Sequence, residues 1–127
     1  MAKVLGLGGL FFKSADCDAT RAWYSRVLGI DFESWGGTVF VPETAAAHPG
    51  AGTVFSPFKA DTDYFAPSTE RFMFNLMVDD LERMLARCAE HGVEPLLHMP
   101  DEMNGSFAHV MDHEGRKIEL WQPKPME

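Results

Sequence analysis

The chain has 127 residues, 46% hydrophobic and 24% charged, which is the composition of one folded domain and excludes a disordered segment. Its net charge of −8 argues against nucleic acid or an anionic membrane as the main partner. Cys17 and Cys88 form no metal-binding or redox motif, and no segment has the apolar length of a signal peptide or membrane span. We therefore expect a cytoplasmic protein.

The first half of the chain predicts a strand, a helix and three further strands. Residues 4–12 form a short apolar run bounded by polar residues, which favours a strand. Asp16 or Asp18 can cap a helix that ends near Leu28, because Gly29 supplies a left-handed stop. The strands that follow are expected at residues 30–35, 38–41 and 52–56.

The second half predicts the same order of elements. Residues 57–69 have no periodicity and indicate a surface connection, and residues 72–78 predict a strand. Asp79 stands three residues before Glu82, which is typical of a helix start, and Gly92 predicts the helix end. The remaining strands are expected at residues 94–98, 106–112 and 116–121.

The two halves are related by a constant offset. Asp16 corresponds to Asp79 and Gly29 to Gly92, with differences of 79 − 16 = 63 and 92 − 29 = 63. A period near half the chain length indicates two copies of one supersecondary unit. Each copy is predicted to be a βαβββ module, and a ligand site could lie between the two modules because each leaves one sheet face uncovered.

The last two predicted strands allow their pairing to be predicted. Segment 113–115 ends in glycine, as in a three-residue hairpin loop. If Asp112 lies opposite Arg116, then His109 lies opposite Glu119 and shares its face. The same face carries Phe107, Met111, Lys117 and Trp121, and the other face carries Ala108, Val110, Ile118 and Leu120. A mixture of aromatic and ionisable side chains indicates a wall that contacts a ligand.

Two motifs of the chain resemble the vicinal oxygen chelate superfamily, which includes glyoxalase I, bleomycin-resistance proteins, fosfomycin-resistance enzymes and extradiol dioxygenases. Residues 22–29 (AWYSRVLG) are similar to its first-helix signature, and residues 112–121 (DHEGRKIELW) to its C-terminal motif. Residues 61–65 and 78–81 are similar to a glyoxalase-like branch of unassigned chemistry.

The resemblance implies an α+β fold for a single glyoxalase-like domain spanning residues 1–127. Two tandem βαβββ modules, at about residues 4–58 and 71–122, would form a half-open barrel around a small-molecule cavity. The resemblance also implies a homodimer with paired or exchanged modules.

The superfamily holds a metal ion at four positions, which correspond here to Gly9, Ser56, Met73 and Glu119. Only Glu119 is a usual ligand of divalent ions, and one carboxylate does not hold such an ion. We therefore expect neither a metal site nor another cofactor, and a metal-dependent glyoxalase or dioxygenase reaction is not expected.

Glu119 and His109 are the candidate catalytic residues. Glu119 would act as a general base if Trp121 and other apolar neighbours raise its pKa, and its carboxylate would orient the imidazole of His109. The alternatives are an inherited acid that pairs with Lys117, and a structural histidine.

Further side chains are predicted to line the ligand cavity. Asn75 shares a face with Met73 and Met77, where its amide must bond either a ligand or the opposite module. The thioether of Met73 can fill a cavity without binding metal, and Ser56 could bond a ligand oxygen. The predicted ligand-binding residues are Phe11, Ser56, Met73, Asn75, Phe107, Met111 and Trp121.

Two functional classes stay open. The first is a glyoxalase-related small-molecule-binding protein with a degenerate metal site that acts as a metal-independent enzyme on a small oxygenated metabolite, with Glu119 or His109 transferring the proton. The second is a non-catalytic protein that sequesters its ligand, similar to the bleomycin-resistance branch. The lost metal ligands favour sequestration, and the apposed His109 and Glu119 favour the enzyme. The predicted partners are a small-molecule ligand and a second copy of the chain.

Overall fold

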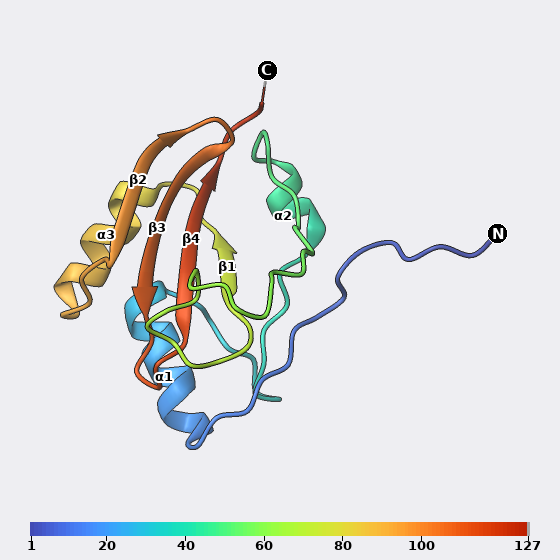
Figure 1. The fold of residues 1–127 in the computed structure, drawn as a ribbon. Helices are drawn as coiled ribbons and strands as arrows, with labels where there is room; N and C mark the ends of the chain where they lie inside the picture. Colours follow the sequence, from blue (N-terminus) through green and yellow to red (C-terminus); the bar gives the residue numbers. More distant parts are fainter. Residues whose placement is uncertain (127) are drawn as a thin grey trace.

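The computed structural model describes residues 1–126 and contains a four-stranded sheet (Figure 1). The strands are ordered β1 (Phe74–Met77), β4 (Lys117–Pro123), β3 (Gly105–Met111) and β2 (Leu97–Glu102). β1 runs parallel to β4, and the other neighbouring strands are antiparallel. Helices α1 (Cys17–Leu28) and α3 (Leu81–Glu90) lie side by side on one face, and a short helix, α2 (Pro42–Ala46), lies beyond the β1–β4 side of the sheet.

The second half of the chain forms the predicted βαβββ order. Its elements follow one another as β1, α3, β2, β3 and β4, with bounds within a few residues of the predicted ones. The N-cap of α3 is Asp80, whose carboxylate accepts a hydrogen bond from the backbone N–H of Arg83 at 3.1 Å, so the prediction of Asp79 is wrong by one residue. After the helix, Gly92 takes a positive φ of 77°, as expected for its end.

The predicted β3–β4 pairing is confirmed. His109 lies opposite Glu119 and Phe107 opposite Trp121, and Gly115 has a φ of 86° in the connecting loop. The face that α1 and α3 cover carries four side chains that are at most 1% exposed, and we call it the apolar face: Ala108, Val110, Ile118 and Leu120. The other face, which we call the polar face, carries Phe107, His109, Met111, Lys117, Glu119 and Trp121.

The first half forms its predicted helix without its predicted strands. Asp16 caps α1 by accepting from the backbone N–H of Ala19 at 3.1 Å, and Gly29 ends the helix with a φ of 74°. The segments predicted as strands, at residues 4–12, 30–35, 38–41 and 52–56, contain none in the part of the chain that is described. A strand needs a ladder of hydrogen bonds to a neighbouring backbone, and among the described residues these segments join no such ladder.

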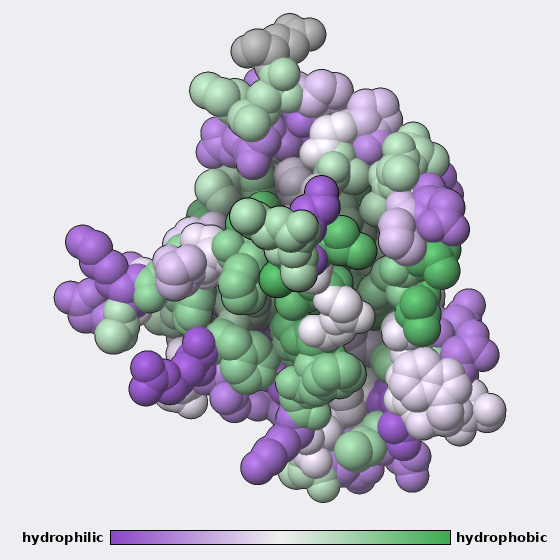
Figure 2. Space-filling model, turned by 90° about the vertical axis from the view of Figure 1, so that its right-hand side faces the viewer, coloured by the Kyte–Doolittle hydropathy of each residue, from purple (hydrophilic) through white to green (hydrophobic). Residues whose placement is uncertain are grey.

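The sheet is therefore open. The described residues form neither the βαβββ module predicted for the first half nor a half-open barrel. The N-terminal segment runs away from the sheet in Figure 1. Figure 2 shows apolar side chains gathered on the surface of the side that this segment and α2 occupy. Five apolar side chains within residues 2–60 are 75–96% accessible: Val4, Leu5, Phe11, Val54 and Phe55.

A buried ionic cluster joins the first half to the β3–β4 hairpin. The Tyr24 hydroxyl donates to Asp112 Oδ2 at 2.6 Å, and Arg116 Nη1 donates to the same oxygen at 2.7 Å. Arg116 Nη2 also donates to the backbone oxygen of Lys13 at 2.7 Å. Burial by itself raises the pKa of Asp112, but the hydrogen bonds from Tyr24 and Arg116 outweigh it and hold the pKa below its usual range.

None of the helices within residues 1–126 is both long enough and apolar enough to cross a membrane.

Candidate functional site

The candidate site is built around the carboxylate of Glu119 in the middle of β4. Because β4 lies between β1 and β3, the register places Asn75 on one side of Glu119 and His109 on the other. Asn75 Nδ2 donates to Glu119 Oε1 at 2.7 Å, and His109 Nε2 lies 2.8 Å from Glu119 Oε2. Glu119 is 8% exposed and His109 is 1% exposed. The structure thus brings together three of the predicted site residues.

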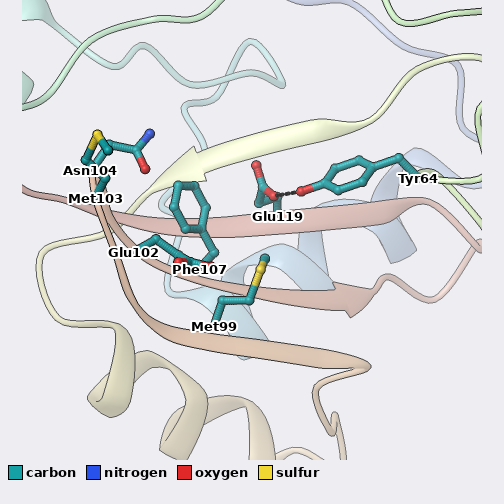
Figure 3. A pocket seen from close by; sticks show the side chains of 7 residues that line it. All are labelled: Tyr64, Met99, Glu102, Met103, Asn104, Phe107 and Glu119. Atoms are coloured by element: carbon teal, nitrogen blue, oxygen red, sulfur yellow. Dashed lines mark hydrogen bonds between the residues drawn. The ribbon is translucent and has the colours of Figure 1, made fainter.

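A fourth residue of the site, Tyr64, was missed by the sequence analysis. Its hydroxyl donates to Glu119 Oε2 at 2.5 Å (Figure 3). The same hydroxyl oxygen lies 3.3 Å from His109 Nε2. Lys117 Nζ donates to the backbone oxygen of Tyr64 at 2.7 Å, and the Phe58 ring stacks on the Tyr64 ring with centroids 5.5 Å apart. The aromatic residues within the predicted surface connection were the signal that could have indicated a packed segment.

The electrostatics of Glu119 differ from the prediction. Burial alone raises the pKa of Glu119, but hydrogen bonds from His109, Tyr64 and Asn75 outweigh burial and hold the pKa below its usual range. The expected raised pKa is therefore wrong, because the polar neighbours stabilise the carboxylate more than the apolar ones disfavour it. Burial and the hydrogen bond to Glu119 raise the pKa of the Tyr64 phenol. Burial also lowers the pKa of Lys117, although nearby Glu119 partly opposes this shift.

The hydrogen bonds indicate where the protons lie. An ionised Glu119 carboxylate can only accept hydrogen bonds, and its Oε2 accepts one from the Tyr64 hydroxyl. Because His109 Nε2 faces the same oxygen, a neutral His109 carries its proton on Nε2. His109 Nδ1 is then a buried acceptor, and no described group bonds it. Tyr64, Glu119 and His109 therefore form one hydrogen-bonded system that can hold or pass a proton.

A hollow of about 380 Å³ opens beside this system on the polar face. It is lined by Tyr64, Met99, Glu102, Met103, Asn104, Phe107 and Glu119. Figure 3 shows Phe107 in its centre, with Met99 on one side and Glu119 and Tyr64 on another. The Phe107 ring stacks on Trp121 with centroids 6.0 Å apart and an interplanar angle of 4°. Trp121 is itself held by a 3.0 Å hydrogen bond from Nε1 to the backbone oxygen of Asn104.

The remaining predicted ligand-binding residues do not join this hollow. Met111 shares the polar face but lies at the other end of β3, opposite Lys117. Met73 is half-buried just before β1, and Ser56 is exposed. Phe11 is 96% exposed and borders a different hollow, of about 600 Å³, beside Arg116. The predicted pocket wall at Phe11 thus lies apart from the Glu119 carboxylate.

The residues present do not fit the metal ion of the resembled superfamily. Of the four corresponding positions, Gly9 and Ser56 lie on exposed segments and Met73 offers only a thioether. Within residues 1–126, no three His, Cys, Asp or Glu side chains are grouped to hold an ion. The neighbours of Glu119 contact it as hydrogen-bond donors and not as further metal ligands.

The fold and the site define a class of protein: an α+β domain whose βαβββ sheet carries a polar cluster beside a ligand-sized hollow. The chain matches the family described as Glyoxalase-like domain over residues 9–121. It therefore belongs to that family, which is part of the vicinal oxygen chelate superfamily, and the resemblance of its motifs is confirmed. Comparison with curated proteins gives no significant match.

Proposed function

We propose that the protein binds a small molecule in the hollow beside Glu119. The observation that carries this proposal is the hollow itself, whose volume of about 380 Å³ falls within the range of small-molecule sites. Its wall combines apolar side chains, Met99 and Phe107, with two oriented polar groups, Tyr64 and Glu119. Such a combination supplies both contact area and specificity.

The chemistry of Glu119 supports binding more than general-base catalysis. A general base works best when its pKa lies near the working pH, but three donors hold the pKa of Glu119 below its usual range. A proton taken up by Glu119 would disrupt its bonds to Tyr64, His109 and Asn75. An ionised, well-held carboxylate is better suited to orient a ligand than to accept its proton.

Methyl NMR of methionine-labelled protein tests the binding proposal. A panel of small amines, carboxylates and neutral aromatics would be added while the methyl signals of Met99, Met103 and Met84 are followed. Met99 and Met103 line the hollow, whereas Met84 packs against the core on the helical side and serves as the control. We expect a ligand to shift the first two signals alone and to be recovered unchanged. A panel without any such ligand would contradict the proposal.

Proton transfer on a small oxygenated metabolite is the second candidate function. The direct contact between His109 and Glu119, extended by Tyr64, favours it because the three groups share protons. In that case Glu119→Gln would abolish turnover of a bound metabolite while ligand binding, followed by the Met99 signal, stays within a few-fold. Full turnover by this variant would show that Glu119 does not transfer the proton, whereas a ligand that the wild-type protein leaves unchanged would favour sequestration.

We also propose that the chain forms a homodimer through its first half. Val4, Leu5, Phe11, Val54 and Phe55 are each 75–96% exposed, and large exposed apolar surfaces are typical of sites that another protein chain covers. Light scattering coupled to size-exclusion chromatography should give twice the 14.2 kDa chain mass. Replacing Val54 and Phe55 by Ser should shift the protein toward the monomer. A wild-type chain that stays monomeric at high micromolar concentration would contradict this proposal.

A further inference from the structure

We infer that the hollow selects a protonated amine joined to an apolar or aromatic body. This inference rests on the proposed small-molecule binding and adds the chemical class of the ligand. It is carried by the charges that line the hollow, by the acceptor atoms that remain free there, and by the aromatic and thioether wall.

The charged side chains that line the hollow are both acidic. Glu102 lies on β2 and Glu119 on β4, and no Lys, Arg or His is among the lining residues. Of the cations near the hollow, Lys117 directs Nζ to the backbone oxygen of Tyr64, and Lys124, whose backbone N–H donates to Asn104, is paired with Asp101. The chain as a whole carries a net charge of −8, which adds to the negative potential. An anionic ligand would be repelled from this hollow, and a cationic ligand would be attracted.

The free hydrogen-bonding capacity beside Glu119 is that of an acceptor. Oε2 already receives two donors, Tyr64 and His109, whereas Oε1 receives only Asn75 and can accept a second bond. The Tyr64 hydroxyl donates its hydrogen bond to Glu119, so only the lone pairs of its oxygen are available to a ligand. A ligand must therefore bring N–H or O–H donors to this end, and an ammonium group brings up to three.

The part of the hollow away from Glu119 has an apolar lining, which suits the apolar or aromatic portion of a ligand that carries an ammonium group. The Phe107 ring stacks on Trp121, which holds the ring in place, and Phe107 is among the side chains that line the hollow. Aromatic faces and thioether sulfurs are electron-rich and polarisable, so Phe107, Met99 and Met103 favour a flat ring or a cation near it. The whole wall thus favours the same sign of charge as the two carboxylates do.

Three probes that share one ring and differ in charge test this inference. They are 2-phenylethylammonium, 3-phenylpropanamide and 3-phenylpropionate, titrated at low salt against the Met99 and Met103 methyl signals. We expect the ammonium probe to bind at least about tenfold more tightly than the propionate, with the amide between them. Raising the salt should reduce this ratio, because exposed charges are screened. Equal affinities, or tighter binding of the propionate, would overturn the inference.

Two glutamine variants with the same change in net charge locate the effect. Glu102→Gln removes a carboxylate from the wall without touching the contacts of Glu119, and Glu90→Gln removes one at the end of α3, on the helical side. We expect Glu102→Gln to weaken the ammonium probe about two- to fivefold and to leave the amide unchanged. Glu90→Gln should change neither affinity. An equal effect of both variants would overturn the inference.

The same titrations separate this inference from the proposed function. If the amide or the propionate shifts Met99 and Met103 and the ammonium probe does not, the hollow is a small-molecule site but the amine class is wrong. If neither these probes nor any member of the wider panel shifts those signals, the proposed function fails as well.

Discussion

The two halves of the chain carry similar sequence patterns but differ in how much structure each one completes. In the second half, four strands pair in one sheet and bury side chains such as Val110 and Ile118 completely. In the first half, α1 packs against that sheet with Ile30 and Phe32 beside it, but apolar side chains such as Leu5 and Phe11 stay more than 90% exposed. The helices formed in both halves because their bonds are internal, whereas strands formed only where another backbone was within reach.

The halves also differ in their part in the site. Glu119, His109, Asn75 and Phe107 all come from the second half, and Tyr64 comes from the connection between the two modules. A repeat in sequence therefore does not distribute the chemistry evenly between its copies. The following predictions test how far each half, and the contact between them, supports the fold and the site.

The largest effect is expected at the cluster that joins the halves. Asp112→Ala would remove a buried carboxylate that accepts from both Arg116 Nη1 and the Tyr24 hydroxyl, and would leave Arg116, 4% exposed, with Glu114 as its remaining carboxylate contact. We expect the free energy of unfolding to fall by about 3–5 kcal/mol in urea denaturation. Asp101→Ala, which removes an exposed partner of Lys124, is the matched control and should cost no more than about 1 kcal/mol. Similar losses in both variants would show that the halves are not joined here.

Two leucine variants compare the packing of the halves directly. Leu120→Ala truncates a side chain that is 1% exposed and should lower the free energy of unfolding by about 2–5 kcal/mol. Leu5→Ala truncates one that is 91% exposed and should change it by less than about 0.5 kcal/mol at low protein concentration. A large loss for Leu5→Ala that grows with concentration would show that a second copy covers this segment.

A smaller effect is expected where the connection between the modules reaches the site. Tyr64→Phe removes one of three donors to Glu119, so the pKa of Glu119 should rise and stability should fall by about 0.5–1.5 kcal/mol. Carboxyl NMR during a pH titration measures the first effect. Tyr24→Phe is the matched control, since its hydroxyl contacts Asp112 and not Glu119. An unchanged pKa of Glu119 in Tyr64→Phe would contradict the site as described.

The smallest effect is expected in the pH dependence of stability. Folding lowers the pKa of both Asp112 and Glu119, so each contributes stability above the unfolded pKa of about 4, and this contribution is lost as pH falls through the lower, folded pKa. Thermal melts between pH 7 and pH 3 should therefore show falling stability below about pH 5. Glu119→Gln should flatten part of this slope. A wild-type protein that becomes more stable on acidification would contradict the direction of both shifts.

Much of the second half could be predicted from the sequence because its signals are local. The glycine at position 115 and the alternation along residues 106–121 set the register, which placed His109 opposite Glu119. Asp16 and Gly29 likewise set the limits of α1 through bonds to their own neighbours. The family followed from motifs within the same segments and is confirmed over residues 9–121.

What only the tertiary structure decided depends on contacts between residues far apart in the chain. Whether residues 4–12 and 52–56 pair as strands depends on a neighbouring backbone, which their own pattern does not supply. Tyr64 reaches Glu119 across a separation of 55 residues, and that contact, with those of His109 and Asn75, reverses the predicted pKa shift. Local patterns therefore determined the helix ends, the sheet register and the residues available for chemistry. The spatial arrangement of their partners determined the protonation of the site and the shape of the hollow.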